Sequence, residues 1–475
     1  MLGQFRNSPC IVKEANLIFH NMSVIVRFAP SPTGDLHIGG ARTALFNYLF
    51  AKKNNGKFLL RIEDTDKKRS TKPAIEAITQ GLDWLGLKHD GEAVFQSQNS
   101  ARHEEIANKL LELDKAYLCY TSAEELAEMR EFHEKKGEVF RFQSPWRNKD
   151  NSQTSTQKPV VRIKSPLSGE IVINDLVQGE VRVKSEEIDD FVILRNDKTP
   201  TYMLAVVVDD FDMNITHIIR GDDHLTNAFR QKAIYDAMGW KCPEFAHIPL
   251  IYGADGAKMS KRHGATSVIE YQKMGYLPEA LRNYLLRLGF SFGDLEIIDD
   301  AKAQEIFDVK NIGKSPSRFD FAKLNNLNKH YIKEKNEVEL LDLASEFFVK
   351  KPNEAEKSRV LQAIHFVKER CDNLENLAKN LEIYFDNFSQ KLEENDQNLL
   401  NEKAEIIKKI IKVLEGVDDW SLEKIKETLN NFANENNLKI KDFGPALRIA
   451  LTFSGKSAGG IFDVVFILGK KEVLK

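Results

Sequence analysis

The chain has 475 residues, which at ~150 residues per domain predicts about three domains. Its hydrophobic content of 42%, with 29 Phe, 11 Tyr and 4 Trp, excludes a largely disordered protein, because disordered chains lack the apolar mass to fill a core. The formal net charge of −3, from 68 Lys and Arg against 71 Asp and Glu, implies that any polyanionic partner is held by a local basic face. The longest nearly continuous apolar run, residues 202–208, is far shorter than the ~18 residues of a membrane-spanning helix.

The cysteines and the N-terminus bear on the compartment. Cys10, Cys119, Cys242 and Cys371 are isolated from one another, without the paired spacing of a zinc or redox site, which favours a reducing cytoplasm. The first 22 residues are too polar and too interrupted for a signal peptide. Because Met22 precedes the first expected strand, these residues are either an extension from an upstream start or an ordered N-terminal segment.

The first expected elements form a strand, helix, strand sequence. Val24–Phe28 reads as a short buried strand, and a loop rich in proline and glycine follows it. Gly39–Lys53 has the spacing of an amphipathic helix, and Lys57–Ile62 reads as the next strand. One such unit predicts a parallel sheet with a right-handed crossover.

A similar alternation returns after residue 195. The expected elements, in chain order, are a strand at Tyr202–Val208, a strand at Ile215–Ile219, a helix at Thr226–Met238 and a strand at His247–Tyr252. Between the two halves, residues 101–195 include a polar stretch and strand-like runs at Val160–Ile163 and Glu170–Ile173. This arrangement predicts a domain inserted into the parallel sheet.

The final third has few strand signals and reads as an α-helical bundle. One expected helical face is apolar and the opposite face is basic, as shown by Ile406, Ile407, Ile410, Ile411 and Leu414 against Lys408, Lys409 and Lys412. The charged runs there are either solvated faces or interaction surfaces.

Two loops carry the candidate chemistry. Residues 29–40 join the first strand to its helix, where glycines permit close approach to a phosphate and the helix N-terminus favours an anion. Residues 256–264 place three cations between glycines after the last strand of the sheet, which suits a mobile loop closing over a triphosphate.

The two loops together resemble the signatures of class I aminoacyl-tRNA synthetases. His37-Ile38-Gly39-Gly40 is similar to the HIGH signature, and Lys258-Met259-Ser260-Lys261-Arg262 is similar to KMSKS. A longer similarity, to bacterial-type glutamyl-tRNA synthetases, covers nearly everything after Met22. It is carried by residues 27–34, 40–46, 61–66, 200–202, 208–210, 219–224, 277–284, 318–320 and 445–448.

This resemblance implies the fold and the domain order. The expected fold is α/β, with a Rossmann-like parallel-sheet catalytic domain, an inserted α/β domain and an α-helical anticodon-binding bundle. The expected segments are an N-terminal extension (1–22), the first catalytic half (23–100), an inserted acceptor-stem-binding domain (101–195), the second catalytic half with the KMSKR loop (196–265), a stem-contact helical domain (266–330) and the anticodon-binding region (331–475).

The resemblance also implies a two-step ligase reaction. ATP, accompanied by Mg²⁺, and L-glutamate would give glutamyl-adenylate and pyrophosphate, and the acyl group would then move to the 3′ end of tRNA(Glu). Such chemistry depends on orientation and charge stabilisation rather than on an acid–base pair. The alternative is a non-discriminating or paralogous enzyme that also or mainly charges tRNA(Gln). A related nucleotidyltransferase, a truncated tRNA-modifying relative and a catalytically silent paralogue are further alternatives.

The site residues follow from the matching positions. Catalysis is expected from His37, Gly39, Gly40 and Lys261. ATP binding is expected from Pro30, Ser31, Thr33, Gly34, His37, Gly39, Lys258, Met259, Ser260, Lys261 and Arg262. Glutamate binding is expected from Arg27, Ser31, Glu63, Tyr202 and Arg220. Arg27 and Arg220 end strands, and a guanidinium suits a carboxylate; buried without an anionic partner, they would reject neutral glutamine without an editing domain.

Three further expectations complete the analysis. Only Cys119 remains where some relatives begin a zinc site, so no zinc and no resident metal are expected, and Cys119 reads as a small buried hydrophobe. Arg370 matches an arginine that discriminating enzymes use against the last anticodon base, with a solvated helix arginine as the alternative. The protein is expected to be a cytoplasmic monomer without membrane contact.

Overall fold

The computed structural model describes residues 23–66, 69–137, 140–142, 144–149, 158–257, 259, 267–456 and 459–475. The chain divides into two compact units. The first comprises Met1–Ile269 and Leu285–Phe319, and the second comprises Glu270–Tyr284 and Asp320–Lys475. The expected boundary at residues 330–331 lies within α11 (Phe321–Glu334).

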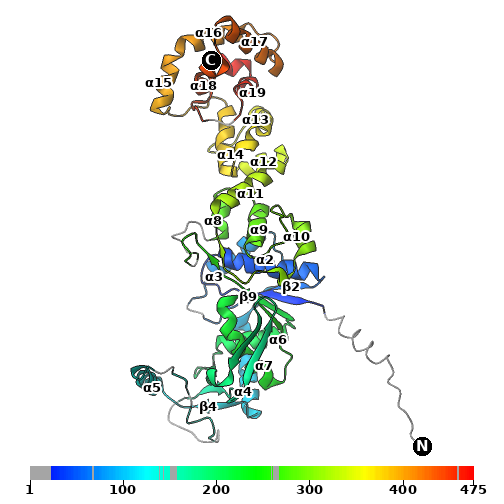
Figure 1. Ribbon diagram of the computed structural model, residues 1–475, viewed down its shortest axis with the longest axis vertical. Coiled ribbons are helices and arrows are strands. Elements are labelled where there is room, and N and C mark those ends of the chain that lie inside the picture. Colours follow the sequence, from blue (N-terminus) through cyan, green and yellow to red (C-terminus); the bar gives the residue numbers. More distant parts are fainter. Residues whose placement is uncertain are drawn as a thin grey trace, which may run out of the picture. The chain divides into compact units, whose positions relative to one another are not determined.

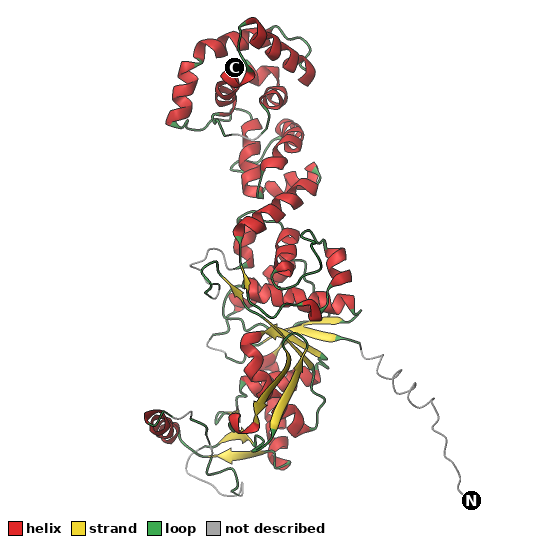
Figure 2. Cartoon of the chain, viewed as in Figure 1, coloured by secondary structure: helices red, strands yellow, loops and turns green. Residues whose placement is uncertain are grey.

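Parallel strands form the centre of the first unit (Figures 1 and 2). β1 (Ile25–Phe28) pairs in parallel with β2 (Lys57–Ile62), which pairs in parallel with β3 (Val94–Phe95). β9 (His217–Gly221) pairs in parallel with β10 (Glu244–Ile248). The N–H of Thr216 donates to the Ile25 carbonyl at 2.9 Å and places β9 beside β1. The expected parallel sheet is therefore confirmed.

Helix α2 (Ile38–Lys53) connects β1 to β2, as the sequence predicts. It begins after His37, whose Nδ1 accepts the Gly39 N–H at 3.1 Å, and Lys52 and Lys53 complement its C-terminal dipole. The other helices of this unit are α3 (Lys72–Trp84), α4 (Ser100–Glu112), α5 (Ala123–Lys135), α6 (Tyr202–Asp212), α7 (Leu225–Met238) and α10 (Asp300–Ile306). The expected helix at Thr226–Met238 is confirmed by α7.

The expected strand at Tyr202–Val208 is wrong, because these residues lie in helix α6. Every residue from Leu204 to Asp210 is buried, so the run is apolar around the whole helix and carries no amphipathic period. A short continuous apolar run does not distinguish a buried strand from a buried helix. The helix brings Asp209 and Asp210 to its C-terminal end, beneath the sheet.

The expected strand at His247–Tyr252 is two strands. β10 ends at Ile248, and β11 (Ile251–Tyr252) pairs instead with β12 (Ser317–Arg318). Pro249 lies at the break, where its missing N–H prevents a continuous ladder. The Pro249 carbonyl accepts a hydrogen bond from the buried Arg42 of α2.

The inserted segment forms antiparallel structure. β5 (Val160–Ile163) lies between β4 (Ala116–Cys119) and β8 (Val192–Leu194), while β6 (Glu170–Asp175) and β7 (Gly179–Lys184) form a hairpin. The strands expected at 160–163 and 170–173 are thus confirmed. The hairpin contacts the parallel sheet, because the Leu176 N–H donates to the Phe245 carbonyl of β10 at 2.8 Å. Cys119 is buried beside Tyr117 and Phe142, as a small hydrophobe would be.

The second unit is helical in its described part (Figure 2). Its α16 (Ala404–Glu415) buries Ile407, Ile410 and Leu414, which confirms the expected apolar face. Its further helices are α11, α12 (Glu337–Ala344), α13 (Glu354–Val367), α14 (Leu374–Leu381), α15 (Glu394–Glu402), α17 (Leu422–Glu435), α18 (Ile440–Thr452) and α19 (Ile461–Val473). The chain passes between the units through α8 (Val268–Lys273) and α9 (Pro278–Arg287).

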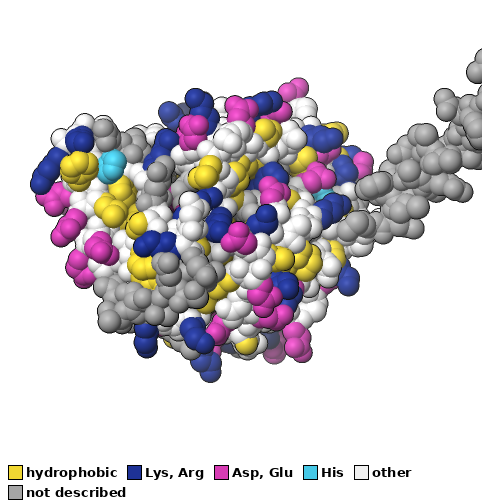
Figure 3. Space-filling view, turned by 90° about the horizontal axis from the view of Figure 1, so that it is seen from below, with side chains coloured by type: hydrophobic (Ala, Val, Ile, Leu, Met, Phe, Trp, Pro, Cys, Tyr) yellow, Lys and Arg dark blue, Asp and Glu magenta, His cyan; other side chains and the backbone are white. Residues whose placement is uncertain are grey.

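None of the helices in the described ranges is long and apolar enough to cross a membrane. On the face drawn in Figure 3, Lys and Arg side chains lie among Asp and Glu side chains, as the formal charge of −3 leads one to expect.

Candidate active site

A cavity of about 720 Å³ opens at the carboxyl ends of β1, β2, β9 and β10 in the first unit. This edge of a parallel sheet is where α/β proteins bind ligands. Every expected catalytic, ATP-binding or glutamate-binding residue that lies in the described ranges lines the cavity: Arg27, Pro30, Ser31, Thr33, Gly34, His37, Gly39, Gly40, Glu63, Tyr202, Arg220 and Met259. Segments far apart in the sequence therefore meet at one site.

The loop after β1 supplies one wall of the cavity. Its last residue, His37, caps α2, and because Nδ1 accepts the Gly39 N–H, the ring proton of the neutral form lies on Nε2. The helix N-terminus that this loop leads into carries a partial positive charge. The wall therefore combines a histidine donor with a site that favours anions.

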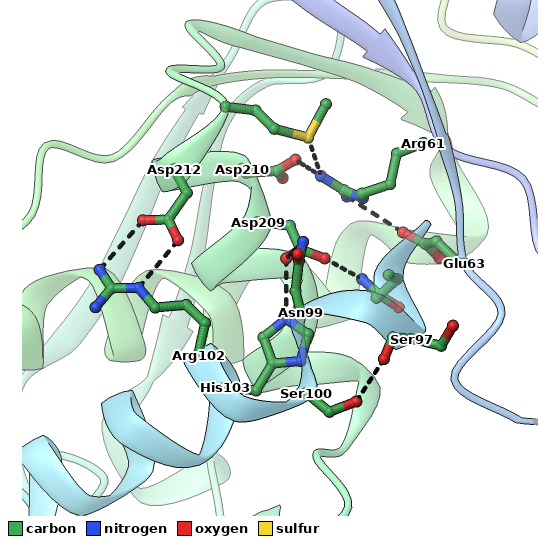
Figure 4. A network of polar contacts seen from close by, with 12 residues as sticks. Arg61, Glu63, Ser97, Asn99, Ser100, Arg102, His103, Asp209, Asp210 and Asp212 are labelled. Carbon is green, nitrogen blue, oxygen red and sulfur yellow. Dashed lines mark hydrogen bonds and ion pairs between the residues drawn. The ribbon is translucent and has the colours of Figure 1, made fainter. Parts of the chain in front are cut away.

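Arg27 lines the cavity and belongs to a buried charge cluster with Arg61, Glu63 and Asp210. Figure 4 shows the last three of these side chains. Its Nε donates to Asp210 Oδ1 at 2.9 Å, and Arg61 Nη1 donates to the same oxygen. Arg61 Nη2 donates to Glu63 Oε1 at 3.2 Å. Arg27 therefore has an anionic partner within the chain, Asp210, so the argument that a buried, unpaired arginine rejects glutamine does not apply to Arg27.

The cluster shifts the titration of its acids in opposite directions. Burial raises the pKa of Glu63, against the opposing charges of Arg61 and Arg27. Burial alone would also raise the pKa of Asp210, but Arg27 and Arg61 outweigh it and hold that pKa below its usual value. Asp210 is thus the permanent anion of the cluster, whereas Glu63 lies at the cavity wall.

Arg220 differs from Arg27 because it has no acidic ion-pair partner among the described residues. Its side chain is 6% exposed, and burial lowers its pKa. Nε donates to His247 Nε2 at 3.1 Å and Nη2 donates to the His224 carbonyl at 3.3 Å, while the buried Nη1 has no hydrogen-bond partner. A buried, unsatisfied guanidinium nitrogen is costly unless a ligand accepts from it.

Aromatic and imidazole side chains surround Arg220. Tyr202 Oη lies 3.4 Å from His224 Nδ1, and Asn227 Nδ2 lies 3.2 Å from the same nitrogen. Burial, and then the nearby Arg220, lowers the pKa of His224. Burial and Arg220 thus both favour the neutral form of His224.

A second cluster of polar contacts surrounds the buried Asp209, the neighbour of Asp210 on α6 (Figure 4). The Asp209 carboxylate lies 2.9 Å from His103 Nε2 and accepts from Gln96 Nε2 at 2.8 Å and Asn99 Nδ2 at 2.9 Å. Sequence reasoning assigned no role to these residues. The available signal was the Asp209-Asp210 pair at the end of a wholly apolar run, because buried carboxylates require partners.

Comparisons with known proteins place the chain in one family. The family "tRNA synthetases class I (E and Q), catalytic domain" matches residues 23–326, and an anticodon binding domain matches residues 339–475. The chain is 50% identical to a glutamate–tRNA ligase of Nitrobacter hamburgensis, over 95% of this chain and 98% of that protein. It is 48% identical to glutamate–tRNA ligase 2 of Parvibaculum lavamentivorans, over 98% and 96%. The chain belongs to the glutamate–tRNA ligase family of class I tRNA synthetases.

Solved structures agree with the fold of this synthetase. A glutamate tRNA ligase of Elizabethkingia meningosepticum, in complex with its amino acid, superimposes with a TM-score of 0.85 at 31% identity, covering 95% of this chain and 98% of that one. Glutamate-tRNA synthetase of Elizabethkingia anophelis gives 0.83 at 30% identity, with the same coverage. The catalytic and anticodon-binding parts expected from the sequence are both present in this synthetase.

Two groups of expected residues are not among the described residues that line the cavity. Lys258, Ser260, Lys261 and Arg262 lie outside the described residues of the synthetase, although Met259 lines the cavity. Arg370 ends the short 3₁₀ helix Lys368–Arg370 in the second unit and is exposed. Burial, and also the positive charge of Arg370, lowers the pKa of Arg448, so two arginines gather in this part of the unit.

Proposed function

We propose that this synthetase uses the cavity at the end of its parallel sheet to activate L-glutamate with ATP–Mg²⁺ before transfer to tRNA(Glu). Aminoacyl-tRNA synthetases in general use ATP and Mg²⁺, and Mg²⁺ enters here as part of the ATP substrate. An oxygen of the α-carboxylate of glutamate attacks the α-phosphorus of ATP, and the bond from that phosphorus to the leaving pyrophosphate breaks. A ribose hydroxyl of the terminal tRNA nucleotide then attacks the acyl carbon, and AMP leaves.

The observation that carries the proposal is the state of Arg220. A buried guanidinium with one unsatisfied nitrogen and no acidic ion-pair partner in the described chain favours an anionic ligand. Arg220 lies in the same cavity as the loop after β1, so the carboxylate it binds lies beside the nucleotide. Glutamate supplies such a side-chain carboxylate, and glutamine does not.

The remaining roles follow from position. His37 and the start of α2 face the ATP phosphates, and Lys261 neutralises charge that develops on the pyrophosphate. Glu63 lies at the cavity wall and accepts from the α-ammonium group of glutamate. Tyr202 and Ser31 complete the amino acid pocket. Arg370 contacts the anticodon from the second unit.

The test is ATP–pyrophosphate exchange with glutamate, measured with and without tRNA, on the parent and on Arg220→Ala. Truncating one member of a buried charge pair should raise the KM for glutamate by about 100-fold or more and leave the KM for ATP nearly unchanged. A glutamate KM close to that of the parent would contradict the assignment.

The tRNA specificity needs a separate measurement. We expect charging of purified tRNA(Glu) to exceed charging of purified tRNA(Gln), and comparable rates would identify a non-discriminating enzyme. Gel filtration with light scattering checks the expectation of a monomer.

A further inference from the structure

His247 lies on β10 between a carboxylate and the glutamate-site arginine. Its side chain is fully buried. Nδ1 lies 2.6 Å from Asp175 Oδ2, and Nε2 lies 3.1 Å from Arg220 Nε. The three side chains come from the inserted hairpin, from β10 and from β9, so the chain Asp175–His247–Arg220 connects the inserted segment to the amino acid pocket.

The contacts of Asp175 determine which imidazole nitrogen carries the proton. Its carboxylate accepts the backbone N–H groups of Val177 (2.9 Å), Gln178 (2.8 Å) and His247 (3.1 Å). Burial alone would raise the pKa of Asp175, but these N–H groups and His247 hold it below its usual value. An ionised carboxylate accepts only, so the proton of the neutral ring lies on Nδ1 and Nε2 is an acceptor.

The guanidinium of Arg220 is held in place by its neighbours. His247 Nε2 accepts from Nε, the His224 carbonyl accepts from Nη2, and the Phe245 ring lies 5.5 Å from the guanidinium carbon. With two of its three nitrogens fixed, the planar group has one orientation, and Nη1 is the nitrogen left for a ligand.

We propose that Asp175 and His247 are positioning residues for glutamate selection: Asp175 fixes the imidazole tautomer, and His247 orients Arg220 so that Nη1 is presented to the side-chain carboxylate of the substrate. This inference rests on the proposed role of Arg220. It assigns part of the substrate selectivity to a residue of the inserted hairpin, which is not expected to contact the amino acid.

The competing explanation is that the pair only fastens the hairpin to β10. Asp175 also accepts the His247 backbone N–H, and Gln178 Nε2 donates to the His247 carbonyl at 2.9 Å. None of these contacts involves Nε2. The two explanations therefore differ at a single ring atom.

Two substitutions of His247 separate the explanations. Glutamine can place its amide oxygen near the former Nε2 and accept from Arg220, whereas asparagine reaches only the former Nδ1 beside Asp175. The proposal predicts that His247→Asn raises the glutamate KM by about 10- to 100-fold, as loss of an orienting partner does, and that His247→Gln restores most of the affinity. A purely structural pair predicts the reverse order.

Further variants test the carboxylate and the coupling. In Asp175→Asn, the amide N–H₂ donates to Nδ1 of His247, which favours the ring proton on Nε2. Nε2 then no longer accepts from Arg220, so the glutamate KM should rise while the KM for ATP stays within about twofold. Glu180→Gln makes the same carboxylate-to-amide change at an exposed site of the hairpin and should change neither. Gln178→Ala weakens the attachment to β10 without touching Nε2 and should leave the glutamate KM unchanged.

All variants are measured by ATP–pyrophosphate exchange in the presence of tRNA, with glutamate and ATP varied separately and glutamine as inhibitor. In the Arg220→Ala background, His247→Asn should add no further effect. A normal glutamate KM in Arg220→Ala would overturn the proposed function. If Arg220→Ala raises the glutamate KM but His247→Asn and Asp175→Asn leave it normal, the positioning role alone is overturned. The same holds if the effects of Arg220→Ala and His247→Asn on the glutamate KM add in the double variant. Should the histidine variants fail to fold, Asp175→Asn decides, because its amide oxygen still accepts the backbone N–H groups.

Discussion

Arg27 on β1 and Asp210 on α6 form a buried ion pair, with Nε 2.9 Å from Oδ1, although they are 183 positions apart in the chain. Arg61 donates to the same carboxylate. Asp210 therefore neutralises Arg27, which lies just before the loop that leads into α2. Arg220, by contrast, has no acidic ion-pair partner among the residues that the structure describes.

The first prediction concerns Asp210→Asn. Removing this charge leaves the buried Arg27 without its ion-pair partner and Arg61 with Glu63 alone, so the free energy of unfolding should fall by about 3–5 kcal/mol. Asp212→Asn is the matched control. Asp212 is the last residue of α6 and also pairs with an arginine, Arg102, but its side chain is 37% exposed. That variant should lose less than about 1 kcal/mol in urea unfolding. Equal losses would show that burial does not set the strength of the Asp210 pair.

The second prediction concerns the stability cost of the amino acid pocket. Without glutamate, Arg220 is a buried cation with an unsatisfied nitrogen, so Arg220→Met should raise the free energy of unfolding by about 1 kcal/mol while abolishing glutamate activation. Arg27→Met, which removes one of the two arginine partners of the buried Asp210, should lower the free energy of unfolding. Urea unfolding of the two variants without substrates measures this contrast. A loss of stability in Arg220→Met would show that its contacts to His247 and His224 outweigh the unpaired charge.

The sequence predicts those helices and strands whose signals lie within a short stretch of the chain. The strand at residues 24–28, the capped helix that follows it and the apolar face of α16 were visible because period, punctuation and caps are local signals. The helix at Tyr202–Asp212 was mistaken for a strand. Its burial on all sides, which is a property of the folded molecule, removes the helical period that identifies exposed helices.

The residues of the candidate site were predictable only in part. The sequence predicts the loop of His37 and the arginines at strand ends as site residues, because their residue types and the family resemblance both indicate binding of anions. The pairing of Arg27 with Asp210 and the contact of Asp175 with His247 span 183 and 72 positions, and no local pattern encodes them. These pairings exist because the fold brings α6 against β1 and the inserted hairpin against β10.

The third prediction concerns Lys261→Ala. A lysine that neutralises charge on the leaving pyrophosphate acts in the transition state, so its loss should slow adenylate formation by about 100- to 1,000-fold. Glutamate binding should be little affected, which single-turnover kinetics and calorimetry measure separately. Lys310→Ala, at an exposed position, is the control. An equal loss in rate and in glutamate affinity would indicate a structural role for Lys261.

The last prediction concerns pH. Burial lowers the pKa of His217, His224 and His247, whereas the same side chains in the unfolded chain titrate near ~6.5. Between the folded and the unfolded pKa values, the unfolded state binds more protons than the folded state. The free energy of unfolding should therefore fall as the pH drops below ~6.5, by up to ~1.4 kcal/mol per pH unit for each histidine. Above about pH 7.5 these groups should contribute no pH dependence. His247→Gln removes one of the three groups, so its unfolding free energy should depend less steeply on pH than that of the parent. Urea unfolding at about pH 7.5, 6.5 and 5.5 measures both slopes. Parallel slopes would mean that His247 binds its proton equally well in the folded and unfolded chains, against the burial that surrounds it.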